Sequence, residues 1–528
     1  MREKEFLPLY KGNTPIDYSK YLLRRVSSSS RLLACIVGLF ILFWLISSRS
    51  SHQTNHRPTD ASEGFDSSWI DRANWRRDSD VAIAERRSIY QPTQFAAGHA
   101  DYNPAYIPVT AVILNWKRPE GVKRIVQYLS KYPFITEILV WNNNKEMRLS
   151  VKDFGLDPTV NPILEVRVWN SDENLHDLSK YTTCSLATND YCYFQDDDWM
   201  NMHLDALYTN FLRAPQLIHS NTMPVIHLEH QRWQFWDPEV HLHTGFTWLG
   251  CGSFVPRENV QRFMAQLGAV GLGKDRLRLA DMYFSIWNND FPWQFSNPLT
   301  PLEQKGAWSE SEGVDQWAIV YYNINDAVSK LLRSLAATTL ITKNDYFTRH
   351  LSEPIPEKRD ARAPCSNDLC LFHTSQSPFP LPSTVVFNRT LTTTVKEQEA
   401  HFNALDFPSN EFWQQHHYFY AVDGDDSTCW NSRRPPQMDD FFGLHAIVAP
   451  NAPTFIIRGH NLPPSTHYLV TISKDGQTFD NCPFTDTEPF HLTLKCNVSG
   501  AHFIRIVFSQ DLQEPIEVCS LRWGDLSV

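Results

Sequence analysis

The sequence has no excess of positive charge and no C-x-x-C pair, and each absence excludes a class of protein. Its 528 residues carry 48 Lys and Arg against 59 Asp and Glu, so no broad basic surface is available to neutralise the phosphates of a nucleic acid. Without C-x-x-C or a regular Cys/His spacing, a zinc site is not indicated. No internal repeat is present. The length predicts two folded domains with additional segments.

One apolar run stands out near the start of the chain. Leu32–Ser48 contains no charged residue and lies between Arg31 and Arg49. At 1.5 Å per residue it spans about 25 Å, which suits a thin internal membrane. The 31-residue basic leader and the lack of an Ala-x-Ala-like site argue against a cleaved signal peptide. We therefore expect a type II signal anchor in the Golgi or endoplasmic reticulum membrane, with residues 1–31 cytosolic and residue 49 onward lumenal.

The cysteines and glycosylation sequons agree with a lumenal chain. Cys365 and Cys370 could close a small loop. Asn388 and Asn497 begin N-x-S/T sequons, which are used only in the secretory lumen. Two bridges could form among the four C-terminal cysteines: Cys429, Cys482, Cys496 and Cys519. An odd trio remains, of which at least one thiol is expected to be free and buried: Cys184, Cys192 and Cys251.

Residues 49–105 are polar and mixed in charge, as expected of a stem, and an α/β pattern follows over 106–350. β-Branched apolar runs alternate there with a stretch of helical spacing. This alternation predicts a mostly parallel, Rossmann-like sheet that binds ligands beyond the carboxyl ends of its strands. The expected strands are Val109–Leu114, Ile135–Trp141 and Leu164–Trp169, with a helix over Gly121–Lys131.

The C-terminal part has a different texture. Residues 351–399 are rich in Pro and Ser and are expected to form a linker. Residues 400–528 contain short alternating strands separated by turn signals, which predicts an all-β sandwich. The expected strands are Thr454–Ile457, His467–Ser473, Phe490–Cys496, Phe503–Phe508 and Ile516–Leu521.

Three consecutive aspartates, Asp196, Asp197 and Asp198, follow the apolar run Tyr191–Gln195. In extended chain Asp196 and Asp198 point to one side and Asp197 to the other. Two converging carboxylates suit a hard divalent cation, Mn²⁺ or Mg²⁺, which would neutralise a diphosphate leaving group. A solvated turn or a helix cap is the alternative explanation of such a run. We expect Asp197 to tolerate replacement better than Asp198.

In their order and spacing, several segments of residues 106–340 resemble the C-terminal transferase domain of the exostosins and exostosin-like proteins. This resemblance implies a GT-A fold, a UDP-sugar donor, Mn²⁺, transfer with retention at the anomeric carbon, and a glycan or glycoprotein acceptor. The similar segments are Thr110–Pro119, Ile138–Asn143, Asp196–Asp198, His243–Phe254, Leu279–Trp287 and Gly306–Trp308.

The resemblance also assigns roles to individual residues. Asp281 would bind or activate the acceptor hydroxyl as the catalytic residue. Asp196 would contact the ribose or sugar and, with Asp198, the metal. The nucleotide would be contacted by Arg118, Asn142, Asn143 and Asn174. One departure is that Ser309 and Glu310 follow Trp308, where the family has basic residues, so Lys305 or Lys180 would have to stabilise the diphosphate.

Each of these residues also has a structural explanation. Arg118 before a proline could be an ordinary loop residue, and Asn142 and Asn143 suit turns through their own side-chain hydrogen bonds. Asp281 lies in an apolar helical stretch, where a carboxylate needs a polar partner. Two functions therefore stay open: a glycosyltransferase, or a lectin-like protein that binds without turnover, for which Ser309 and Glu310 are the argument.

The C-terminal stretch resembles a discoidin-type (coagulation-factor type C) jelly roll. Such modules commonly bind glycans or membranes through loops at one end, which implies a possible carbohydrate contact. A domain that only packs on the transferase is the alternative. The segments that carry the resemblance are Ala421–Trp430, Asp440–Leu444, Ser473–Gly476 and His502–Ile506.

Overall fold

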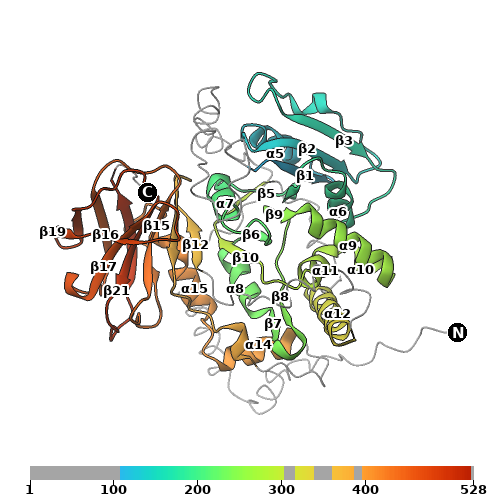
Figure 1. The fold of residues 1–528 in the computed structure, drawn as a ribbon. Coiled ribbons are helices and arrows are strands. Elements are labelled where there is room, and N and C mark those ends of the chain that lie inside the picture. Colours follow the sequence, from blue (N-terminus) through green and yellow to red (C-terminus); the bar gives the residue numbers. More distant parts are fainter. Residues whose placement is uncertain (1–106, 303–315, 338–359, 386–394, 525–528) are drawn as a thin grey trace, which may run out of the picture. The chain divides into compact units, whose positions relative to one another are not determined.

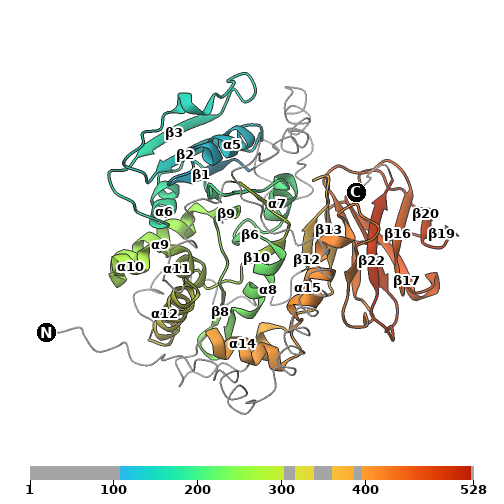
Figure 2. The same cartoon turned by 180° about the vertical axis from the view of Figure 1, so that it is seen from behind.

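The computed structural model describes residues 107–302, 316–337, 360–385 and 395–524 (Figures 1 and 2). Within these ranges, no helix is both long enough and apolar enough to cross a membrane. The predicted anchor Leu32–Ser48, its cytosolic leader and the whole stem lie outside them.

A seven-stranded sheet in the order β10-β6-β9-β4-β1-β2-β3 forms the centre of a mixed α/β domain, as the sequence predicts. β1 is parallel to both β2 and β4, and β2 is parallel to β3. β9 runs antiparallel to β4 and β6, and β10 runs parallel to β6. The strands are β1 Val109–Asn115, β2 Ile135–Asn142, β3 Glu165–Asn170, β4 Tyr191–Gln195, β6 His219–Thr222, β9 Ser253–Pro256 and β10 Trp293–Ser296.

Helices cover both faces of this sheet because its central strands are apolar on both sides. Ala111 and Ile113 of β1 enter one core together with helices α5 and α7, whereas Val112 enters the other with α6, α9, α11 and α12. The helices are α5 Pro119–Leu129, α6 Leu178–Ser185, α7 Leu204–Phe211, α8 Pro224–Arg232, α9 Arg257–Val270, α10 Lys274–Leu277, α11 Ala280–Trp287 and α12 Gln316–Ala337. Two short pairs complete the domain: β5 Trp199–Met200 with β11 Thr300–Pro301, and β7 Gln234–Asp237 with β8 Leu242–Gly245.

The C-terminal domain consists of two antiparallel sheets around one apolar core. One sheet has the order β12-β13-β15-β21-β17-β18 and the other β14-β22-β16-β20-β19. The first contains β12 Ala361–Pro364, β13 Cys370–Thr374, β15 Phe441–Ala446, β17 Tyr468–Ser473, β18 Asp480–Asn481 and β21 Phe503–Phe508. The second contains β14 Trp430–Asn431, β16 Thr454–His460, β19 Phe484–Glu488, β20 His491–Leu494 and β22 Glu517–Trp523.

The segment expected to be a linker over 351–399 contains two strands of this sandwich, which corrects that expectation. β12 pairs with β13, and β13 pairs with β15 along its whole length. The high content of Pro and Ser suggested a linker. A short hairpin closed by a disulfide can nevertheless form with few β-branched residues, because β15 pairs with β13. Helices α14 Val395–Ala404 and α15 Asn410–His416 follow and pack on the α/β domain near α8.

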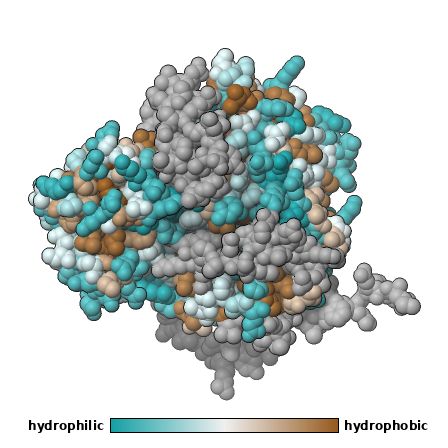
Figure 3. Space-filling view, viewed as in Figure 1, coloured by the Kyte–Doolittle hydropathy of each residue, from teal (hydrophilic) through white to brown (hydrophobic). Residues whose placement is uncertain are grey.

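The cysteine pairing follows the expected grouping. Cys365 is bonded to Cys370, and Cys251 is free and buried. The remaining bonds are Cys184–Cys192, Cys429–Cys519 and Cys482–Cys496. On the face shown in Figure 3, hydrophobic residues lie in separate patches between hydrophilic ones.

Candidate functional site

The candidate site lies where the order of the parallel strands reverses. From β1 the chain proceeds to β2 and β3 on one side and then returns to β4 on the other side of β1. The carboxyl ends of β1 and β4 are therefore neighbours, with Ile113 opposite Gln195. Ligands of open α/β sheets bind at such a reversal, beyond the strand ends. Arg118 follows β1 there, and the three aspartates follow β4.

Arg118 joins these two strand ends. Its guanidinium bonds to the carboxylate of Asp197 and lies 3.2 Å from Oδ2 of Asp198. The backbone N–H of Trp116 donates a 3.3 Å hydrogen bond to the other oxygen of Asp197. Burial lowers the pKa of Arg118, but Asp197 and Asp198 raise it by more, so the guanidinium is charged. The nucleotide contact predicted for Arg118 stays a prediction.

Asp197 is the aspartate that holds the fold. Its side chain is 5% exposed and carries both bonds just described. We expected this residue to tolerate replacement better than Asp198, but its burial and its two bonds argue against that expectation. An amide in its place would leave buried donors of Arg118 and Trp116 with a weaker partner. That expectation rested only on the direction in which the Asp197 side chain points in extended chain. Direction alone does not reveal which groups a side chain contacts.

Asp196 and Asp198 are the more accessible aspartates, with side chains 36% and 19% exposed. Burial raises the pKa of Asp198 to about 7, with Arg118 opposing and the other two aspartates adding to the rise. The charges of Asp196 and Asp197 thus act on Asp198, and a bound cation would relieve this repulsion. Oxygen donors with surplus negative charge are what Mn²⁺ and Mg²⁺ require. The residues therefore fit a divalent cation.

Lys180 connects Asp196 to the interior of the domain. It lies in the first turn of α6, and its side chain is 0% exposed. Its ammonium nitrogen is 3.3 Å from Oδ1 of Asp196 and 3.0 Å from Oδ2 of Asp281. Tyr181 donates a 2.6 Å hydrogen bond to Oδ1 of Asp281. The partly exposed carboxylate of Asp196 is thus linked to the buried one of Asp281 through a single cation.

The charge on Lys180 is maintained by its surroundings. Burial lowers the pKa of Lys180, but Asp196, Asp281 and Asp177 together raise it above its usual value. Burial, reinforced by the charge of Asp281, raises the pKa of Asp177 well above its usual range. One buried ammonium thus compensates two carboxylates, Asp196 and Asp281, whereas the raised pKa of Asp177 favours its neutral form.

Asp281 lies in α11, where every side chain is buried. The sequence predicted that a polar partner would justify this carboxylate, and Lys180 and Tyr181 are that partner. With its side chain 3% exposed, the carboxylate contacts these two groups rather than open space. Its predicted role at an acceptor hydroxyl stays a prediction.

Among the predicted asparagines, Asn142 ends β2, and Asn143 and Asn174 lie on the loops after β2 and β3. Asn142 is buried, and its amide donates to the carbonyl of Met147 and to the side chain of Asn170. Asn143 accepts from the backbone of Leu175 at 3.0 Å. Asn174 accepts from the backbone N–H two residues later. Asn142 and Asn143 thus shape these loops internally, and a nucleotide contact for the three residues is untested.

The missing side chain of Gly250 leaves room for the carboxylate of Asp196. Its carbonyl accepts a 2.8 Å hydrogen bond from the N–H of Asp196, and a β-carbon at this position would overlap the Asp196 carboxylate. Its φ lies outside the left-handed region, so the neighbouring carboxylate alone is what excludes a side chain.

Gly250→Ala should therefore displace the Asp196 carboxylate and leave the remaining fold intact. Because a misplacement of about 1 Å can cost 10²-fold in rate, we expect metal-dependent donor turnover to fall by about that factor. Gly268→Ala is the matched control, since no atom lies within 4 Å of its added methyl in α9. That change should raise stability by about 0.5–1 kcal/mol and spare turnover. Equal turnover in both variants would remove Asp196 from the site.

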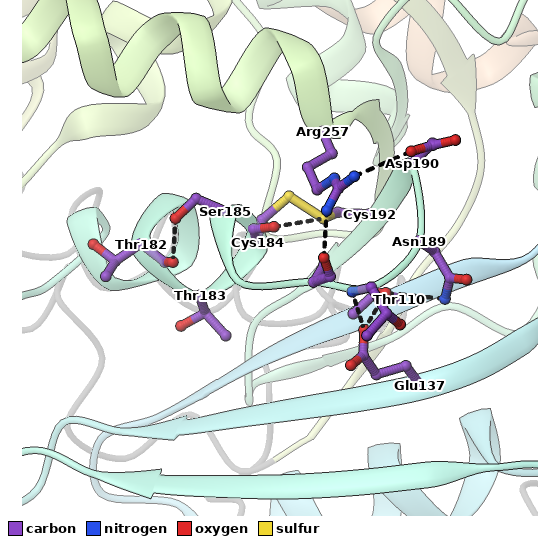
Figure 4. The surroundings of a disulfide bond; sticks show 12 residues. Thr110, Glu137, Thr182, Thr183, Cys184, Ser185, Asn189, Asp190, Cys192 and Arg257 are labelled. Atoms are coloured by element: carbon purple, nitrogen blue, oxygen red, sulfur yellow. Dashed lines mark hydrogen bonds and ion pairs between the residues drawn. A yellow bond between two sulfur atoms is a disulfide. The ribbon is translucent and has the colours of Figure 1, made fainter.

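A disulfide fixes α6 relative to β4 (Figure 4). Cys184 near the end of α6 is bonded to Cys192 at the start of β4, so the helix that carries Lys180 is tied to the strand that leads to Asp196. Arg257 donates to the carbonyl of Ala187 at 2.6 Å and to Asp190 at 3.1 Å within the same connection. The loop between α6 and β4 is thus fixed at both ends.

Sequence reasoning missed the central place of Lys180 and the parts played by Asp177, Tyr181 and Gly250. No local motif marks them, because α6 and α11 meet only in the folded chain. Trp308, Ser309, Glu310 and Lys305 lie outside the described residues.

No family model matches the chain, and no curated protein matches it. Among solved structures, mannosyltransferase PcManGT from Pyrobaculum calidifontis in complex with GDP-Man and Mn²⁺ is similar, with a TM-score of 0.28 and 11% identity over 54% of this chain and 87% of that chain. S. aureus TarS is similar with a TM-score of 0.26 and 9% identity over 76% of this chain and 72% of that chain. Scores this low carry no argument, so the assignment of a function rests on the site and the motifs.

Proposed function

We propose that the protein is a metal-dependent glycosyltransferase that moves a sugar from a UDP-sugar to a glycan or glycoprotein acceptor, with retention. The observation that supports this most is the meeting of Arg118, Asp196 and Asp198 at the reversal of strand order. A cation site and a fixed guanidinium at that position suit a nucleoside diphosphate. The choice of a UDP-sugar as donor and of retention at the anomeric carbon rests on the segments that resemble the exostosin transferase domain.

In this proposal Asp196 and Asp198 hold Mn²⁺ or Mg²⁺, which when bound neutralises charge on the leaving diphosphate. Arg118 keeps the two strand ends together and adds positive charge beside the same group. Lys180 lies against one oxygen of Asp196 and so helps to hold this carboxylate in place. Asp281 orients Lys180 through the ion pair between them in the interior of the domain.

We also propose that Leu32–Ser48 anchors the protein in a Golgi or endoplasmic reticulum membrane, with both described domains in the lumen. The four disulfides support an oxidising compartment. A glycan attached to a sequon engineered into residues 1–31 would contradict this topology.

The proposal is tested by incubating the full-length protein with a panel of UDP-sugars and measuring release of UDP, with Mn²⁺ and with a chelator. We expect slow, Mn²⁺-dependent hydrolysis of one donor, accelerated by the correct acceptor. Mn²⁺-dependent UDP binding without release from any donor would favour the lectin-like alternative. If UDP does not bind in the presence of Mn²⁺, both are wrong.

A further inference from the structure

A row of basic side chains crosses the six-stranded sheet of the C-terminal domain. Arg362 of β12 is opposite His373 of β13, which is opposite Gly443 of β15, which is opposite Arg505 of β21. Directly opposed residues lie on the same face of a sheet. Gly443 has no side chain, so nothing on that strand separates His373 from Arg505.

This face of the sheet is directed at the α/β domain rather than at water. The alternate residues, such as Phe372 and Ile504, enter the core of the sandwich. β12 lies beside β10 (Figures 1 and 2), and the guanidinium of Arg362 is 5.3 Å from the ring centre of Trp293 on β10. Arg213, after α7, donates a 2.5 Å hydrogen bond to the carbonyl of Asp475 in the sandwich. Three arginines from two domains thus meet at this junction.

In the described part of the chain, the charges of Arg362 and Arg505 are only partly balanced. Oδ2 of Asp360 is 3.6 Å from Arg362 and 3.5 Å from Arg505, which are long distances for charge-assisted hydrogen bonds. Asp475 also acts on Arg213, but its carboxylate accepts hydrogen bonds within its own turn. Among the described residues, Asp360 is thus shared by Arg362 and Arg505, and a single carboxylate cannot balance two guanidiniums.

The hydrogen-bonding capacity of the cluster is also unfilled. Within the described part of the chain, no partner lies within hydrogen-bond distance of three buried nitrogens: Nε of Arg362, Nε of Arg505 and Nε2 of His445. Burial, above all, lowers the pKa of Arg362 and of Arg505 to about 10, and neighbouring guanidiniums add to this while Asp360 opposes it. Buried donors without acceptors and surplus positive charge both destabilise a fold.

Aromatic rings fix the guanidiniums in place. Arg505 lies between Phe441 and Phe479, 3.9 and 3.8 Å from their ring centres. Arg213 lies 5.3 Å from the centre of Phe503. The Arg505 side chain is 18% exposed and that of Asp360 is 30% exposed, so solvent reaches the edge of the cluster at these two residues. A rigid, partly open group of guanidiniums is pre-organised for planar or tetrahedral oxyanions.

We propose that Arg213, Arg362 and Arg505 form a binding site for a small tetrahedral oxyanion, phosphate or sulfate, at the junction of the two domains. Such a dianion would accept hydrogen bonds from the guanidiniums and outweigh the surplus positive charge of Arg362 and Arg505. Because Arg213 belongs to one domain and the other two arginines to the other, the bound anion would also connect the domains. The site is independent of the proposed transferase function.

The test uses the full-length protein and two probes, inorganic phosphate and sulfate, with sodium chloride at matched ionic strength. We expect saturable binding of either probe by calorimetry and a saturable rise in melting temperature, neither of which chloride produces. Arg505→Gln should weaken binding at least about tenfold, because one charged donor pair is lost. Arg458→Gln is the matched control, since Arg458 lies on the other sheet and is paired with Asp426.

Asp360→Asn distinguishes an anion site from a simple ion-pair cluster. Removing the carboxylate removes repulsion of the ligand, so both probes should bind at least about tenfold more tightly. If the cluster only joins the domains, this variant loses stability and gains no affinity, which would overturn the proposal. An equal response to chloride, or equal weakening by Arg458→Gln, would also overturn it. Should Arg505→Gln fail to fold, Arg213→Gln takes its place with the same expectation.

Discussion

Asp198→Asn should abolish Mn²⁺-dependent binding of UDP and reduce sugar transfer by at least about 10³-fold. The amide carries no charge and is a poor ligand for a hard cation, and the electrostatic stabilisation that would be lost is worth several kcal/mol. The fold should survive, because the amide oxygen can still accept from Arg118, which keeps its bond to Asp197. Calorimetry of UDP with and without Mn²⁺, together with thermal melting, measures both quantities.

Two neighbouring aspartates serve as controls for this result. Asp190→Asn changes an exposed carboxylate just before the same strand and should leave UDP binding unchanged. Asp197→Asn should instead lower the melting temperature, because this residue is buried against Arg118 and Trp116. Unchanged Mn²⁺-dependent affinity in Asp198→Asn would show that the cation binds elsewhere or not at all.

Lys180→Met should destabilise the α/β domain by about 3–5 kcal/mol, the usual cost of removing one partner from a buried ion pair. Asp281 would then be buried without its counter-charge. The double variant Lys180→Met with Asp281→Asn should recover part of this loss, since the uncompensated carboxylate is gone. A double-mutant cycle of melting free energies measures that coupling.

Lys330→Met is the contrast. Lys330 pairs with Asp326 at 2.5 Å, but its side chain is 21% exposed, and Asp326 also contacts Arg276. The expected loss is at most about 1 kcal/mol. Equal losses for the two lysine variants, or additive effects of Lys180→Met and Asp281→Asn, would show that the buried ion pair is not a unit.

The single variant Asp281→Asn then separates its two possible roles. If Asp281 acts through Lys180 and Asp196, transfer and Mn²⁺-dependent UDP affinity should fall together. If it faces the acceptor hydroxyl, transfer should fall by about 10²–10⁴-fold while UDP affinity stays. Full transfer per folded molecule, with a lower melting temperature, would assign it to stability alone.

The sequence predicted the elements whose signal is local. The apolar runs that became β1 and β2, and the aspartates after β4, are visible because a buried strand and a polar strand end leave a pattern within ten residues. The bond between Cys365 and Cys370 is short-range in the same sense. The fold class and the place of Asp198 follow from such patterns.

The remaining features depend on contacts that no local pattern encodes. Lys180 and Asp281 are 101 residues apart in sequence, and the partners of Asp197 lie on the loop after another strand. β12 and β13 were misread because the pairing of β13 with β15 joins segments about 70 residues apart. The amino-acid composition of a segment therefore does not reveal whether it forms a strand, because its partner strand can lie far away in the sequence.

The path of the chain between the domains has a consequence for how the protein could be divided or could have arisen. β12 and β13 belong to the sandwich, α14 and α15 then return to the α/β domain, and only afterwards does the chain supply the rest of the sandwich. The sandwich is therefore not one continuous stretch that recombination could have appended or that a stop codon could cleanly delete. A protein ending near residue 400 would retain the hairpin of β12 and β13 with the edge of β13 uncovered, and an uncovered strand edge recruits other chains. Shortened forms of this protein should be judged first by whether they stay in solution.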